Sequence, residues 1–305
     1  MSDLKLFRID SGAAVELQGT ALALERPLQT LIEHNMEVLF GVRLVASEHS
    51  TGKKHGGRID SLGLDENGSP VIFEYKRSVN ENVINQGLFY LDWLLDHRAE
   101  FELLVMRKLG PKAAEQIDWT APRLVCVASD FTRYDEHAIA QINRGIELVR
   151  YRDYDSAFLT LDLVASTSAT ATAAGAEEPA KPGPRSSQKT VTQLHEQAPE
   201  ELKNLYDALE TYILSLGDDV TKTTRQNYFA FRRIKNFACV EIHPQVKKLL
   251  VYLKNDPASV TLEPGFTRDV TRIGHFGTGN LEVTISSSQD LDRALALILD
   301  SYQGS

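Results

Sequence analysis

The stretch GRIDSLGLDENGSPVIFEYK spans residues 57–76 and decides how the first half of the chain folds. Two strand-like runs lie on either side of the turn residues Asn67-Gly68, which form one of the strongest short hairpin signals. These runs are Arg58–Leu64 and Pro70–Lys76. The stretch therefore predicts a β-hairpin with Asp60 near its beginning and with Glu74 and Lys76 at its end.

The length of the hairpin turn determines where Asp60 points. A two-residue turn at Asn67-Gly68 would place Asp60 opposite Tyr75, on the face away from Glu74. A three-residue loop of residues 66–68, with Gly68 left-handed, would place Asp60 directly opposite Glu74, as would a compensating bulge. Only this second register brings two carboxylates and the Lys76 ammonium to one face.

Crowding two carboxylates and an ammonium on one face is costly unless a cation and an anion share the site. A divalent metal ion and a phosphodiester would supply both charges, so we take a metal-dependent nuclease as the leading hypothesis. The alternative interpretation is an ordinary cross-strand cluster of ion pairs.

The order of these residues resembles the signature of the PD-(D/E)xK nuclease superfamily. Gly57-Arg58-Ile59-Asp60, then Glu74-Tyr75-Lys76, then a helix that carries Gln86, are similar to the nuclease domain of NucS-like endonucleases. The resemblance covers roughly residues 25–130. It implies a restriction-endonuclease-like mixed α/β sheet flanked by helices, and a Mg²⁺- or Mn²⁺-dependent DNA endonuclease activity.

The resemblance and the residue types together predict a role for each side chain. Lys76 would position or deprotonate the attacking water, and Gln86 would fix that water or a phosphate oxygen. Hard oxygen ligands suit Mg²⁺ or Mn²⁺. The expected metal ligands are Asp60, Glu74, the Tyr75 carbonyl and Glu37 of the preceding helix. For Glu37, an ordinary solvated helix position is the competing interpretation.

Basic residues near the hairpin are the expected nucleic-acid contacts. Guanidinium forks match phosphate geometry, which favours Arg58 and Arg77. Lys53 and Lys54 lie in the glycine-flanked stretch TGKKHGG, which suits a loop that contacts DNA. The competing interpretations are pairing of the arginines with neighbouring acids and a solvated turn for the lysines.

Composition sets limits on the class of protein. The 305 residues are 42% hydrophobic and 25% charged, which is typical of a globular protein with two ordinary domains. The net charge of −9 argues against a broad surface that coats nucleic acid. We expect a cytoplasmic protein without a membrane segment or secretory signal, in which Cys126 and Cys239 are small core residues. The histidines show no zinc-site spacing.

Three regions follow from changes in composition along the chain. Residues 1–164 form the nuclease-like domain, and residues 199–305 form a small α+β domain. Residues 165–198 lack aromatic side chains and are rich in Ala, Ser, Thr, Pro and Gly, so we expect a flexible linker. Helical spacing predicts helices at residues 25–40, 81–97, 101–108, 136–143 and 200–215, and a final helix capped by Ser288.

The second domain offers two interpretations of one stretch. Residues 227–254 interleave aromatic and basic side chains, as in a platform that stacks bases and binds phosphates. The same alternation also divides a strand into a core face and a wet face, which we favour. Residues 202–302 resemble a small bacterial C-terminal domain of unknown function that is sometimes labelled a predicted transport protein. We assign this domain to recognition of nucleic acid or of a protein partner.

The sequence thus predicts a DNA endonuclease in DNA repair or in defence against foreign DNA. The alternative from another class is a catalytically inactive nucleic-acid-binding or protein-adaptor module that retains the nuclease fold. The preferred nucleic-acid structure, DNA against RNA, the number of metal ions and the oligomeric state, a homodimer included, stay open at this level.

Overall fold

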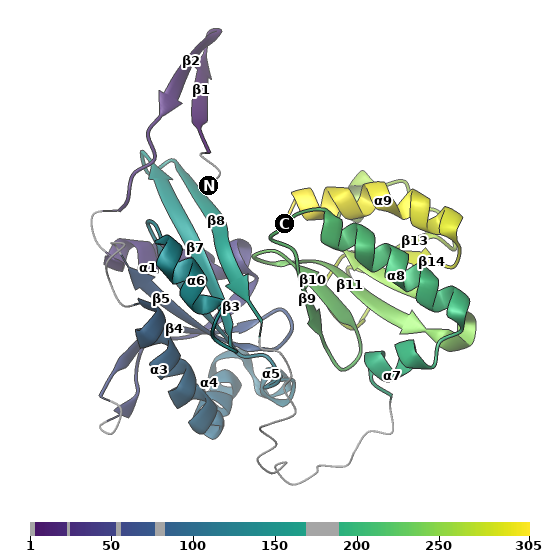
Figure 1. The fold of residues 1–305 in the computed structure, drawn as a ribbon, viewed down its shortest axis with the longest axis horizontal. Coiled ribbons are helices and arrows are strands. Elements are labelled where there is room, and N and C mark those ends of the chain that lie inside the picture. Colours follow the sequence, from purple (N-terminus) through teal and green to yellow (C-terminus); the bar gives the residue numbers. More distant parts are fainter. Residues whose placement is uncertain (1–3, 23–24, 53–55, 77–82, 169–188) are drawn as a thin grey trace. The chain divides into compact units, whose positions relative to one another are not determined.

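The structure is a computed structural model that describes residues 4–22, 25–52, 56–76, 83–168 and 189–305. The chain divides into two compact units, whose main boundary lies at Thr170–Ala171. Each unit is built on its own six-stranded sheet (Figure 1). Within the described residues, none of the helices is both long and apolar enough to cross a membrane.

The sheet of the first unit has the strand order β3-β4-β5-β6-β7-β8. Its strands are β3 (Val42–Ser50), β4 (Arg58–Asp65), β5 (Pro70–Lys76), β6 (Arg123–Ala128), β7 (Gly145–Tyr154) and β8 (Phe158–Thr167). Strands β3, β4 and β5 are antiparallel, whereas β5, β6 and β7 run parallel and β8 returns antiparallel. This arrangement confirms the predicted mixed sheet.

Helices cover both faces of this sheet (Figure 1). On one face, Trp93 and Phe101 are fully buried against the sheet core. They come from α3 (Val83–Asp96) and α4 (Arg98–Leu109). On the other face lies α1 (Glu25–Phe40), whose Met36 approaches β4 at Gly63. Short helices α5 (Pro111–Glu115) and α6 (Arg133–Ile139) complete the crossovers to β6 and β7.

Helix α1 has the bounds that its apolar spacing predicts. Leu28, Ile32 and Met36 recur every four residues and are almost completely buried. Gly41 follows at a φ of +63°, a conformation that ends a helix at little cost for glycine. The helix is kinked at Asn35, where φ is −121° and ψ is 16°. The kink separates residues 25–34 from residues 36–40 of the helix.

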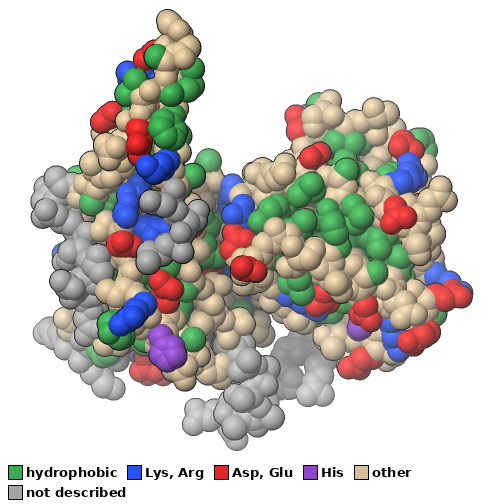
Figure 2. All heavy atoms as spheres, turned by 45° about the horizontal axis from the view of Figure 1, so that its top comes forward, with side chains coloured by type: hydrophobic (Ala, Val, Ile, Leu, Met, Phe, Trp, Pro, Cys, Tyr) green, Lys and Arg blue, Asp and Glu red, His purple; other side chains and the backbone are tan. Residues whose placement is uncertain are grey.

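A two-stranded hairpin precedes α1. Strands β1 (Leu6–Asp10) and β2 (Ala13–Leu17) pair with each other in an antiparallel register. Figure 2 shows this hairpin standing out from the first unit with hydrophobic side chains on its surface. Large exposed apolar residues of this region are Leu4, Phe7, Ile9 and Val15.

The second unit has an antiparallel sheet in the order β13-β14-β12-β11-β10-β9. Its strands are β9 (Thr221–Thr224), β10 (Phe229–Arg232), β11 (Asn236–His243), β12 (Lys248–Leu253), β13 (Thr267–Asp269) and β14 (Leu281–Ile285). Helices α8 (Glu200–Ser215) and α9 (Ser288–Gln303) bury their apolar sides on one face of it. The 3₁₀ turns are η1 (Pro244–Val246) and η2 (Pro257–Ser259). The predicted α+β class is confirmed.

Several predicted boundaries need correction. Strand β8 continues to Thr167, and α7 (Val191–Glu196) begins after a capping box at Thr190, so ordered elements enter the expected linker from both ends. The remainder of that linker, residues 169–188, lies outside the described residues. Helix α6 begins at Arg133, because Thr132 caps it, and α9 is capped by Ser287 instead of Ser288.

The two cysteines lie in the two sheets, Cys126 on β6 and Cys239 on β11. Both are free and fully buried. Their predicted role as small core residues is therefore confirmed.

Candidate active site

The hairpin adopts the three-residue loop. Ser61 pairs with Phe73 and Leu64 with Pro70, and the same register places Asp60 opposite Glu74. The Asp65 amide donates to the Ser69 carbonyl at 2.9 Å, which closes the loop. Gly68 sits at a φ of +79°, as this loop requires. The register on which the nuclease hypothesis depends is therefore the observed one.

Asp65 holds this turn in place. Its Oδ1 accepts hydrogen bonds from the backbone amides of Asn67 at 2.9 Å and Ser69 at 2.8 Å. Its Oδ2 lies 3.4 Å from Arg123 Nε, and Arg123 Nη1 donates to Glu147 Oε2 at 2.8 Å. All three charged side chains are buried. The network anchors the turn to β6 and β7. The turn lies before the first residue of β5, whereas Glu74 lies near the last residue of that strand.

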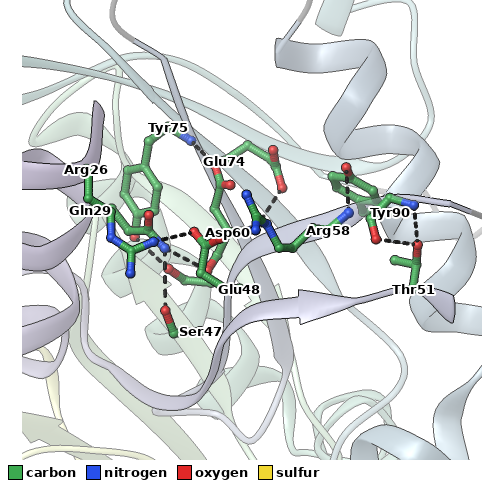
Figure 3. A network of polar contacts seen from close by, with 12 residues as sticks. Arg26, Gln29, Ser47, Glu48, Thr51, Arg58, Asp60, Glu74, Tyr75 and Tyr90 are labelled. Carbon is green, nitrogen blue, oxygen red and sulfur yellow. Dashed lines mark hydrogen bonds and ion pairs between the residues drawn. The ribbon is translucent and has the colours of Figure 1, made fainter. Parts of the chain in front are cut away.

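Asp60 and Glu74 each bind the backbone of the other's strand (Figure 3). Asp60 Oδ2 accepts from the Tyr75 amide at 3.0 Å. Glu74 Oε1 accepts from the Asp60 amide at 3.4 Å. The two carboxyl groups are thus fixed beside each other where β4 begins and β5 ends.

The electrostatics of this pair favour a cation. Glu74 is fully buried, and its Oε2 has no hydrogen-bond partner among the described residues. Burial first, and then the charge of Asp60, raise the pKa of Glu74 to about 9. Burial also raises the pKa of Asp60, against the opposing effects of the Tyr75 amide and Lys76. Without a cation, at least one proton stays on the pair at neutral pH.

Lys76 supplies the positive charge next to the two carboxylates. Its charge lowers the pKa of both Asp60 and Glu74. The ammonium is largely buried, and its Nζ lies 3.9 Å from Glu25 Oε2 at the start of α1. The predicted grouping of Asp60, Glu74 and Lys76 is what the structure shows.

Side chains of helix α1 form hydrogen bonds with β4, the strand that carries Asp60. The Gln29 amide nitrogen donates to the Asp60 carbonyl and to Glu33 Oε1, both at 3.0 Å. Glu33 Oε1 also accepts from the Ser61 hydroxyl at 2.7 Å, and that hydroxyl lies 3.2 Å from the Tyr75 hydroxyl. These buried and partly buried contacts tie α1, β4 and β5 together at the level of the two carboxylates.

Gln86 and Arg58 meet through Tyr90. Gln86 Nε2 donates to the Tyr90 hydroxyl at 3.3 Å, and this hydroxyl accepts from the Arg58 amide at 3.1 Å. A Cβ at Gly57 would lie 2.6 Å from the Tyr90 ring, so only glycine fits there. Gly57 therefore leaves room for the Tyr90 ring. Tyr90 in turn links α3 to Arg58, the first residue of β4.

The structure describes the positions of only some of the remaining predicted residues. Glu37 is exposed on α1 beyond the kink at Asn35, and its role as a metal ligand stays a prediction. Arg58 is exposed at the edge of the site. Lys53, Lys54 and Arg77 lie outside the described residues.

Sequence reasoning missed several neighbours of the site. Side chains of α1, β3 and α3 lie next to it, namely Glu25, Gln29, Glu33, Glu48 and Tyr90. Their spacing gave one usable signal. Positions 25, 29 and 33 recur every four residues and so follow one side of a helix.

The donor set fits a hard divalent cation. Two carboxylates from adjacent strands are the ligands that Mg²⁺ or Mn²⁺ prefers, and Glu74 Oε2 is buried without a partner. The part of the chain that the structure describes contains no group of three or more His, Cys, Asp or Glu residues arranged around one metal position. The Tyr75 carbonyl as a further ligand stays a prediction.

A hollow lies between the first hairpin and the sheet of the first unit, with a volume of about 840 Å³. Basic side chains gather there at the foot of the hairpin (Figure 2). The charged lining residues are Lys5, Glu16, Asp130, Arg150, Arg152 and Asp162. The three positive and three negative charges balance, and Arg150 is held by Asp130 and Asp162. The hollow therefore has no excess charge that would select an anion.

The aromatic side chains of residues 227–254 are buried, so they do not form the exposed stacking platform that was the less favoured interpretation. Tyr228, Phe229, Phe231 and Arg232 are all buried, with Phe229 and Phe231 in the helix-facing core. Tyr228 packs on the other face of the sheet with Cys239 and Tyr252. The alternation of side chains therefore builds two packed faces, instead of the one core face and one wet face that the alternation predicts.

The second unit matches a family model, and the chain as a whole is similar to a curated protein. Residues 191–305 match a family model described as "Domain of unknown function (DUF5655)". The chain is 29% identical over 301 residues to an uncharacterized protein of Haemophilus influenzae, covering 97% of this chain and 98% of that protein.

Two solved structures are similar in part. One is a repair endonuclease from Pyrococcus abyssi, at 21% identity over 43% of this chain and 48% of that one. The other is an EndoMS–dsDNA2 complex, at 22% identity over 43% and 47%. Both have a TM-score of 0.29. The chain thus spans about half the length of each, and at this TM-score neither likeness bears on its chemistry.

Proposed function

We propose that the protein is a Mg²⁺- or Mn²⁺-dependent DNA endonuclease that hydrolyses phosphodiester bonds at Asp60, Glu74 and Lys76. The observation that supports this most is the Glu74 carboxyl group, which is fully buried beside Asp60 and has one oxygen without a partner. Such a group is costly unless it binds a cation or keeps a proton. A nearby ammonium adds a complementary site for a phosphate.

The roles of the side chains follow from their positions. Asp60 and Glu74 would hold the cation, together with the proposed ligands Tyr75 and Glu37. The bound cation would supply Lewis acidity toward a phosphate oxygen. Lys76 would hold positive charge where negative charge develops on the phosphate, and would position the attacking water. Gln86, held against Tyr90, would orient that water or a phosphate oxygen.

The choice of DNA, and of repair or defence as the setting, rests on the resemblance carried by residues 57–86. The second unit would recognise the substrate or a partner. We retain the cytoplasm as the proposed location and leave open whether two copies associate.

The first test replaces the three proposed catalytic residues one at a time. We expect Asp60→Asn, Glu74→Gln and Lys76→Ala each to lower the rate of Mg²⁺-dependent cleavage of labelled DNA by about 10²-fold or more. The matched controls are Asp92→Asn and Lys108→Ala, which change exposed residues of α3 and α4. Cleavage at the wild-type rate in all three site variants would refute the proposal.

An inactive binding or adaptor module would behave differently. Such a module would show no Mg²⁺ or Mn²⁺ binding that depends on Asp60 and Glu74. We expect calorimetric titration of the wild-type chain to show binding of Mn²⁺, and Asp60→Asn to abolish it. Nucleic-acid binding without any metal binding would favour the module instead.

A further inference from the structure

Two arginines hold one carboxylate at the edge of the candidate site. Arg26 Nη1 lies 3.0 Å from Glu48 Oε1, and Arg58 Nε lies 2.7 Å from Glu48 Oε2. Arg26 belongs to the first turn of α1, Glu48 to β3 and Arg58 to the start of β4. Figure 3 shows the three side chains grouped next to Asp60. We call Arg26 and Arg58 the arginine pair.

Glu48 lies level with the two catalytic carboxylates. Ser47 pairs with Ser61 and His49 with Ile59, so Glu48 stands across from Asp60, which in turn faces Glu74. Glu48 has a φ of +53°, a left-handed conformation that costs about 1–2 kcal/mol for a residue with a side chain. Backbone strain of this kind is typical of functional sites and needs a reason in the surrounding structure.

The arginine pair is open to solvent. Each arginine side chain is 67% exposed, whereas Glu48 is only 22% exposed. Glu48 engages one nitrogen of each guanidinium, and it is the only ion-pair partner that the described residues offer them. Each guanidinium therefore keeps N–H donors directed to solvent. Two arginines and one glutamate leave one net positive charge beside a site that is otherwise acidic.

We propose that the arginine pair binds the phosphodiester backbone of a nucleic acid next to the phosphate that is cleaved, and that Glu48 holds both guanidinium groups in place for it. The proposal rests on the proposed function for its substrate and adds Arg26 and Glu48 to the site. Guanidinium forks bind phosphate oxygens with two parallel hydrogen bonds, and fixing them in advance reduces the entropy lost on binding. Arg58 lies two residues before Asp60 on β4, so one bound nucleic-acid strand can contact both residues.

The competing explanation is that the arginines only neutralise Glu48. Removing an arginine from the wild-type chain would then leave Glu48 unpaired and disturb the fold or Asp60 indirectly. The experiment therefore uses a Glu48→Gln background. In this background, removing an arginine does not leave a Glu48 carboxylate without its partner. In that background a loss of affinity on removing an arginine reports a contact with the nucleic acid.

The measurement is fluorescence anisotropy of a labelled DNA duplex and of its single strand, in EDTA and at several salt concentrations. We expect Arg26→Ala and Arg58→Ala, each in the Glu48→Gln background, to weaken binding by about three- to tenfold. Each should also reduce the slope of log affinity against log salt by about 1 for the duplex. The matched control is Arg8→Ala, because Arg8 is also exposed and pairs with one carboxylate, Asp10, at 2.8 Å.

A second set of variants guards against misfolding. Arg26→Lys and Arg58→Lys keep the charge but lose the fork, so the salt slope should persist while affinity falls. Unchanged affinity and slope in both alanine variants would overturn the proposal. Because binding is measured without metal, a wild-type chain that binds through the arginine pair but never cleaves would refute the proposed hydrolysis alone.

Discussion

At the scale of single residues, Glu74 is the most deeply buried carboxyl residue in the part of the chain that the structure describes. It lies on a central strand, it is fully buried, and it faces a second carboxyl group across the hairpin. The same burial that raises its pKa to about 9 would also make it a strong ligand for a bound cation. Under the proposed function, the chemistry of the site and its cost in stability would come from one side chain.

The pH dependence of stability tests this assignment. Glu74 has an ordinary pKa of 4.5 and a pKa of about 9 in the folded chain, so between these values the folded state binds one more proton than the unfolded state. In EDTA, its contribution to the free energy of unfolding should fall by about 1.4 kcal/mol for each pH unit across that window. Glu74→Gln should flatten this part of the profile and raise stability near pH 8.

Urea unfolding at a series of pH values measures this effect. Asp92→Asn serves as the control, because Asp92 is exposed on α3 and should leave the profile unchanged. A Glu74→Gln profile that keeps the wild-type slope would show that Glu74 is ionised in the folded chain.

At the scale of elements, the hairpin turn decides whether the site exists. Its loop of three residues depends on Gly68 at positive φ and on Asp65, which accepts from two amides of the turn. A Cβ at Gly68 would lie 2.5 Å from the Gln116 carbonyl oxygen. The position therefore excludes other residues for two reasons, backbone conformation and space.

Gly68→Ala should lower the free energy of unfolding of the first unit by about 2–3 kcal/mol, because strain and a backbone clash add. Gly52→Ala is the matched control. Gly52 also has a positive φ, +76°, close to that of Gly68, but a Cβ there meets no atom within 4 Å, so only the backbone strain of about 1–2 kcal/mol applies. Equal losses in the two variants, measured by urea unfolding, would contradict the close contact at Gly68.

Helix α1 illustrates what spacing can and cannot predict. Its bounds, its buried side and its glycine stop all follow from local sequence. Which of its acids lie at the site does not: Glu25 and Glu33 contact residues of the site, whereas Glu37 is exposed beyond the kink at Asn35. A sequence pattern assumes a straight helix, and a kink breaks that assumption.

At the scale of the whole molecule, each of the two units has a large hydrophobic core of its own among the described residues. The cluster under α3 and α4 draws only on residues of the first unit, and the cluster under α8 and α9 draws only on residues from Val191 onward. Each core is large enough to support cooperative unfolding of its own unit.

Calorimetry should therefore resolve two thermal transitions. Leu62→Ala, in the first core, should lower one melting temperature by several degrees and leave the other unchanged. Leu209→Ala, in the second core, should do the reverse. A single transition that both substitutions shift equally would show that the two units unfold together.

The sequence alone determined the local elements and the candidate residues. Apolar spacing, a glycine after a helix and the turn residues Asp65–Gly68 identified α1, β4, β5 and α8. The family resemblance identified Asp60, Glu74, Lys76 and Gln86. These features depend on neighbours within a few residues, where propensity and periodicity act directly.

Only the tertiary structure decided which side chains meet. Glu48 reaches Arg58 across 10 residues of the chain, Gln29 binds the Asp60 carbonyl across 31, and Tyr90 accepts from the Arg58 amide across 32. Such contacts depend on strand order, on the direction of α1 and on burial, which no local pattern encodes. The hairpin register lies between these limits: the sequence reduced it to two choices, and the packing of Gly68 and Asp65 selected one.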